Sequence, residues 1–126
     1  MIYFSFGDQL FKKNYRSCRI DIVIASKPKF DSPYAFLEEA AEMLVSKLNR
    51  DEYCHLQSKD CFLKLGAYSS IIEHWISSLH EDAEIVIDDI QYTFRVKNPG
   101  YLNPCEDVYV VSTPNEYMLF IWSTSD

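Results

Sequence analysis

Cysteine and histidine are the residues here that could hold a metal ion, and four of them occur in a zinc-finger-like order. Cys54, Cys61, His74 and His80 follow one another, with twelve residues between Cys61 and His74. Six residues separate the two cysteines, however, where about two to four are usual. The two histidines lie six positions apart on a predicted helix, so they face different ways. We therefore predict no metal site and no cofactor.

The adjacent pair Cys54 and His55 is the one arrangement that could serve nucleophilic catalysis. A cysteine nucleophile needs a base within hydrogen-bond reach and a third group that orients the base. Sequence neighbours seldom point at each other, and no known signature surrounds the pair.

The start of the chain, MIYFSFG, has no basic region typical of a secretory signal. We expect four free thiols, a reducing cytoplasmic location and no enzymatic activity. The four cysteines are Cys18, Cys54, Cys61 and Cys105.

Carboxylates gather after the second predicted helix, where they could bind a hard cation or act as acid and base. These residues are Glu81, Asp82, Glu84, Asp88 and Asp89. They lack the spacing and the glycine turn of a calcium loop. The chain has only three glycines, and none forms a phosphate-binding loop, so a nucleotide enzyme is not expected.

The charge is unevenly distributed along the chain, whose net charge is −7. Residues 1–29 contain six basic and two acidic residues, a balance of +4. Residues 30–126 contain six basic and seventeen acidic residues, a balance of −11. An acidic body repels nucleic acid and anionic membranes and attracts basic partners. We expect neither a nucleic-acid partner nor a membrane partner.

Aromatic residues are abundant, with nine tyrosines, eight phenylalanines and two tryptophans. Tyrosine and tryptophan are enriched where proteins bind proteins. Tyr101 lies in a predicted loop over Asn98–Asp107, beside Glu106 and Asp107. The loop therefore predicts an exposed surface that is both aromatic and acidic.

A predicted helix over Asp31–Arg50 carries some of the acidic residues. Ser32 is a good N-cap residue, and Pro33 falls at the first helical position. Apolar residues cover about half of the helical wheel, and Glu38, Glu39 and Glu42 lie opposite them. We expect an apolar face formed by Leu37, Ala40, Leu44 and Leu48. We expect this face to pack on Tyr92, Phe94, Phe120 and Trp122.

The rest of the chain alternates between apolar and polar residues, as β-strands do. Strands are predicted over 2–6, 18–25, 107–112 and 116–122, a second helix over 67–80, and a hairpin over 84–97. Phe62, Leu63 and Leu65 fit either a short strand or the approach to the second helix. Met118–Trp122 is apolar at every position, which is typical of a strand covered on both faces. The pattern predicts a single α+β domain over 1–126, with a mostly antiparallel sheet of five to six strands covered by two helices.

In size, charge and texture the chain resembles the small cytosolic immunity proteins that bacteria pair with contact-dependent or other polymorphic toxins. The resemblance implies tight binding to a cognate basic toxin domain, often a nuclease. The basic segment Lys12–Arg19 departs from the otherwise acidic pattern. The residues expected to bind the partner are Glu38, Glu39, Glu42, Glu81, Asp82, Glu84, Asp88, Asp89, Tyr101, Glu106 and Asp107.

A second hypothesis is a small α+β enzyme or ligand-binding domain. Its pocket would lie between helices and sheet, near Cys54, His55 and His74. A deep polar pocket that holds these groups would favour this second class.

Overall fold

The computed structural model describes residues 1–6, 18–57, 62–66, 77, 87, 90–97 and 106–124. Its strands are β1 Ile2–Phe6, β2 Cys18–Ser26, β3 Phe62–Gly66, β4 Tyr92–Lys97, β5 Glu106–Ser112 and β6 Glu116–Thr124. Its helices are α1 Pro33–Glu42, the π-helix η3 Met43–Lys47, and the 3-10 helices η2 Lys27–Lys29 and η4 Asp51–Gln57. None of the described helices has the length and apolar character that a membrane span requires.

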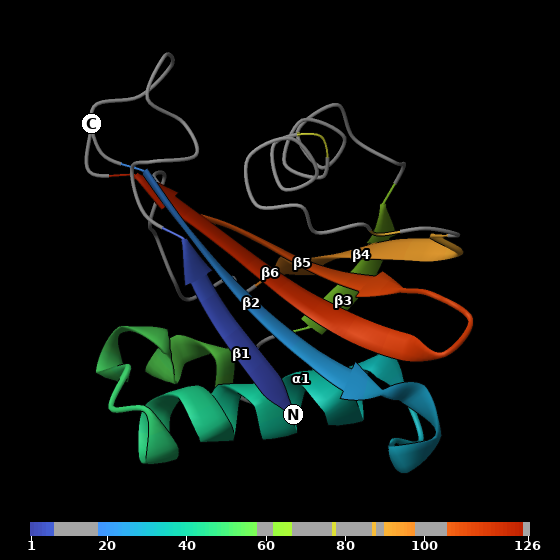
Figure 1. The fold of residues 1–126 in the computed structure, drawn as a ribbon, viewed down its shortest axis with the longest axis horizontal. Helices are drawn as coiled ribbons and strands as arrows, with labels where there is room; N and C mark the ends of the chain where they lie inside the picture. Colours follow the sequence, from blue (N-terminus) through green and yellow to red (C-terminus); the bar gives the residue numbers. More distant parts are fainter. Residues whose placement is uncertain are drawn as a thin grey trace.

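The six strands form one sheet in the order β1-β2-β6-β5-β4-β3, and every neighbouring pair is antiparallel. The predicted α+β class and antiparallel sheet are confirmed. The segment Phe62–Gly66 is a strand. Figure 1 shows α1 lying across one face of the sheet. The predicted helix over 67–80 lies outside the described residues, apart from Ser77.

The predicted hairpin over 84–97 is wrong, although its second strand exists as β4. Residues Thr93–Arg95 pair with β3 on one side and with β5 on the other. A strand has only two edges for hydrogen bonding, so no edge remains for a partner over 84–88. One of the two neighbours of β4, β3, comes from much earlier in the chain, and local alternation carries no information about such a distant pairing.

The N-terminal cap of α1 agrees with the prediction, but the end of the helix does not. The Ala35 amide donates a hydrogen bond to Ser32 Oγ over 3.1 Å, which confirms the cap. After Glu42 the helix widens into the π-helical η3, and the Leu48 amide donates to the Met43 carbonyl five residues back. This wider turn takes Leu48 out of phase with the apolar face. Leu48 is 38% exposed, so its predicted burial is wrong.

The core beneath α1 is built by helix residues that are fully buried. Phe36, Leu37, Ala40, Ala41 and Leu44 have no exposed surface. They pack in one cluster with sheet residues that include Val23, Val110, Leu119 and Ile121. Phe94 packs against this cluster as expected. Tyr92 does not, because it is 55% exposed.

The opposite face of the sheet carries a second cluster, formed by Ile20, Ile22, Tyr109, Val111, Met118 and Phe120. Phe120 belongs to it and Trp122 packs against it, so neither contacts α1 as predicted. Alternation along β6 assigned these residues to a common face, but it could not say which face the helix covers. Of the predicted stretch Met118–Trp122, the first four residues are buried, which confirms that this part of the strand is covered on both sides, and Trp122 is half-buried.

The buried position of Leu44 makes a direct test of the helix packing. Leu44→Ala should lower the free energy of unfolding by about 2–5 kcal/mol, because it leaves a cavity under α1. Leu48→Ala is the matched control and should change it by less than about 0.5 kcal/mol. Urea unfolding of both variants measures the difference. Equal losses at the two positions would contradict the packing described here.

Candidate functional site

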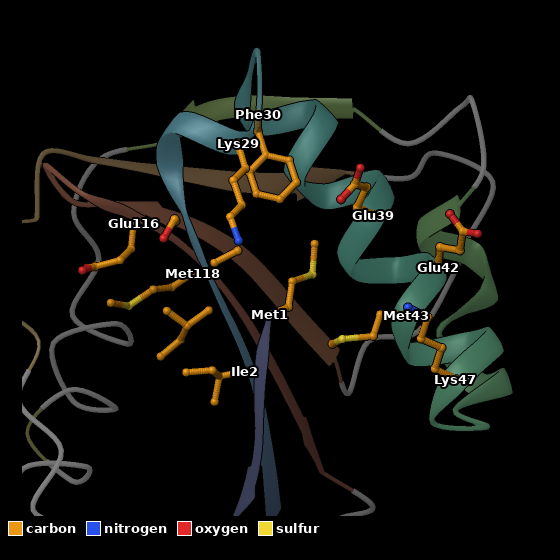
Figure 2. A pocket seen from close by; sticks show the side chains of 13 residues that line it. Met1, Ile2, Lys29, Phe30, Glu39, Glu42, Met43, Lys47, Glu116 and Met118 are labelled. Atoms are coloured by element: carbon orange, nitrogen blue, oxygen red, sulfur yellow. The ribbon is translucent and has the colours of Figure 1, made fainter.

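A groove of about 1110 Å³ opens between the start of β1, the end of β2 and the helix α1 (Figure 2). Its apolar lining comes from four parts of the chain. These residues are Met1, Ile2, Ile24, Ala25, Phe30, Met43 and Met118. All three methionines of the sequence line this one groove. Methionine is flexible and polarisable, and it is used heavily at surfaces that adapt to a partner.

The wall of the groove nearest β2 is held by packing and by one lysine. The Phe30 ring lies edge-on to Phe36 of α1, with 5.5 Å between the ring centroids. The ammonium group of Lys27 donates to Ser112 Oγ over 2.7 Å and lies 5.4 Å from the centroid of the Tyr117 ring. These contacts tie η2 to the sheet, so the adjoining residues Lys29 and Phe30 have a fixed support.

Charged side chains of both signs border the apolar lining. Glu39 and Glu42 of α1 and Glu116 of β6 supply carboxylates, and Lys29 and Lys47 supply ammonium groups. Figure 2 shows that Glu39 and Glu42 come from the same stretch of α1. Within the described part of the chain, the carboxylates of both residues make no ion pair and no side-chain hydrogen bond. They are therefore available to an outside cation.

The residues predicted to bind a partner are only partly brought together. Glu38, Glu39 and Glu42 are exposed on α1, as predicted, and two of the three line the groove. Asp107 lies elsewhere: it pairs in register with Trp122, and its carboxylate lies 3.8 Å from the Arg95 guanidinium. Glu106 begins β5. The other predicted residues lie outside the described part of the chain: Glu81, Asp82, Glu84, Asp88, Asp89 and Tyr101.

A buried polar network centred on Asp21 of β2 was not predicted from the sequence. The Asp21 side chain is completely buried. It accepts a hydrogen bond from Tyr3 Oη over 2.5 Å and another from Tyr53 Oη. Arg19 places its Nε 3.0 Å from one carboxylate oxygen and its Nη2 3.0 Å from the other. One carboxylate thus joins β1, β2 and η4.

The charges of this network stabilise one another. Burial lowers the pKa of the Arg19 guanidinium, but the hydrogen bond with Tyr3 and the charge of Asp21 raise it by more. The net pKa lies above the ordinary value. Arg50 also donates to Tyr3 Oη, over 3.1 Å. With two phenols and a guanidinium on one carboxylate, Asp21 has a structural role. The sequence signal that could have revealed this network is Asp21 itself, because a carboxylate on the buried face of a strand needs hydrogen-bond or ion-pair partners.

The hypothesis of a pocket near Cys54, His55 and His74 gains no support from the described residues. Cys54 is exposed on η4 and does not line the groove. The His55 side chain, Cys61, His74 and His80 lie outside the described part. Within that part, no three residues of the metal-binding types form a group that could hold an ion.

Comparison of the chain with models of protein families, with curated proteins and with solved structures finds no match.

The Asp21 network makes a second stability prediction. Asp21→Asn should lower the free energy of unfolding by about 3 kcal/mol, since it leaves Arg19 without its counter-charge. Removing one partner of a buried ion pair usually costs about 3–5 kcal/mol. We expect a loss at the lower end of this range because the Arg19 side chain is 32% exposed. Asp107→Asn, which breaks the more exposed pair with Arg95, is the control and should cost less than about 1 kcal/mol. A loss at Asp21 no larger than at Asp107 would contradict the structural role.

The thiols and histidines make a third prediction. A chelator and a reductant should each leave the thermal midpoint unchanged, because we expect folding to depend on neither zinc nor disulfides. Differential scanning calorimetry with and without each reagent measures this. A fall of many degrees with the chelator would instead favour zinc at Cys54, Cys61, His74 and His80, since structural zinc contributes folding free energy directly.

Proposed function

We propose that this protein is a cytoplasmic immunity protein that binds and neutralises a cognate basic toxin domain, typically a nuclease. The observation that carries the proposal is the exposed acidic surface of α1, formed by Glu38, Glu39 and Glu42. These carboxylates have no ion-pair partner within the described part of the chain.

The arrangement of these carboxylates favours an external partner. Glu38 and Glu42 lie one turn apart on the same helix face, and such a like-charged pair costs a few tenths of a kcal/mol. No described cation forms an ion pair with either carboxylate. A basic partner would offset it and would also be drawn towards the surface before contact, because complementary charge raises the rate of association.

The helix is a rigid support for these charges. Its opposite face is fully buried at Phe36, Leu37, Ala40, Ala41 and Leu44, and Ser32 caps its first turn. The helix backbone that carries the carboxylates is therefore fixed without a partner, and only the glutamate side chains have to be ordered on binding.

The charge-reversed variant with Glu38, Glu39 and Glu42 all changed to Lys tests this proposal. Its association with the protein encoded by the neighbouring gene should slow by about tenfold or more at low salt and show less salt dependence than the parent. Its free energy of unfolding should change by less than about 1 kcal/mol, because all three side chains are exposed. Stopped-flow association at two salt concentrations and urea unfolding provide the measurements.

A second triple reversal at Glu81, Asp82 and Glu84 makes the same change in net charge at another site. A slower rate for the α1 variant alone assigns the steering to the helix. If both variants associate like the parent, charge steering is wrong. If no protein encoded beside this gene binds, the inhibitor function itself is wrong.

A further inference from the structure

We infer that the groove beside α1 binds an apolar segment of a basic protein partner, with Lys or Arg side chains of that segment pairing with Glu39 and Glu42. This inference rests on the proposed function and deepens it. It assigns the contact surface and the chemistry of the segment that fills it.

The size of the groove suits a peptide segment. Its volume of about 1110 Å³ exceeds the roughly 300–1,000 Å³ of typical small-ligand pockets. An open groove of this volume has room for several residues of a partner.

The apolar lining reaches the surface, where it would otherwise contact water. Ile2 is 57% exposed and Met1 is 43% exposed. Met43 continues the lining towards α1, whereas Met118, which is 6% exposed, continues it onto the face of the sheet away from α1. Covering such a patch gains hydrophobic free energy in proportion to the apolar area removed from water. The three methionines can adjust their rotamers to the shape of the occupant.

The charges of the α1 wall of the groove favour a basic occupant. Glu39 and Glu42, three positions apart on α1, both line the groove and make no ion pair with Lys29 or Lys47 among the described residues. Glu116 adds a third carboxylate, whose Oε2 already accepts a hydrogen bond from Thr113. The lining also holds three cationic groups, Lys29, Lys47 and the α-amino group of Met1, so the preference for a cationic partner rests on the two unpaired carboxylates of the α1 wall.

Glu38 provides an internal comparison. It is exposed and belongs to the same helix, and reversing it changes the net charge as much as reversing Glu39 does. It does not line the groove. A partner seated in the groove must therefore respond to Glu39 and Glu42 and be nearly indifferent to Glu38, whereas general attraction to an acidic protein would treat the three alike.

Three short synthetic peptides test the inference: alternating Lys and Leu, alternating Glu and Leu, and alternating Lys and Ser. Calorimetric titration should show binding of the Lys–Leu peptide only. Glu39→Lys and Glu42→Lys should each weaken this binding by about tenfold, and Glu38→Lys by less than about twofold. Ile2→Asp should weaken it similarly to Glu39→Lys, and the matched variant Leu48→Asp, outside the groove, should not.

Several outcomes would overturn the inference. Equal binding of the Lys–Ser peptide would remove the apolar contribution, and equal binding of the Glu–Leu peptide would remove the charge contribution. Equal losses of affinity for the Lys–Leu peptide in Glu38→Lys and Glu39→Lys would show that net charge alone causes the effect. No binding of the Lys–Leu peptide would reject the groove as a site for this chemistry.

The same variants separate this inference from the proposed function. If the neighbouring gene's protein binds but ignores Glu39→Lys, Glu42→Lys and Ile2→Asp, the inhibitor function stands and the groove is wrong. If the peptides respond as expected but that protein does not bind, the groove stands and the inhibitor function is wrong.

Discussion

The burial of the apolar face of α1 against the sheet is the contact on which the rest of the structure depends. Five helix residues without exposed surface meet Val23, Val110, Leu119 and Ile121. This packing fixes the rotation of the helix about its own axis, and so determines which glutamates face outward. It also places Glu39, Glu42 and Met43 along one wall of the groove. The acidic surface and the groove are therefore consequences of one helix–sheet contact, and a rotation of α1 would remove both.

The Asp21 network also holds the helical segments against the sheet, but through hydrogen bonds and an ion pair. Hydrophobic packing has no direction, whereas a carboxylate that accepts from Tyr3 and Tyr53 and pairs with Arg19 fixes angles as well as distances. Because Tyr53 belongs to η4, the network holds the segment after α1 against β2. Breaking a buried ion pair at one partner is costly, and this cost opposes alternative arrangements of the segment. The two interactions together give α1 defined supports along its buried face and beyond its C-terminal end.

Local patterns predicted what depends on local chemistry. The Ser32 cap, the strands around Ile20 and Leu119, and the outward position of Glu38, Glu39 and Glu42 follow from side-chain types and their periods. The assignment of Phe120 to the helix side failed because a strand buried on both faces shows no contrast between them. The burial of Leu48 failed because a π-helical turn changes the period. The groove was not predicted, since Met1, Met43 and Met118 come together only through the topology.

Hydrogen–deuterium exchange of the protein with and without the product of the neighbouring gene tests the central claim most directly, because it locates the contact without any substitution. The account predicts that amides near the groove, at Ile2, in Ser26–Phe30 and in Glu39–Lys47, exchange more slowly in the complex. Amides of β4 around Tyr92 and of η4 around Cys54 should exchange at unchanged rates. Protection confined to β4 or η4, with the groove amides unaffected, would contradict the account.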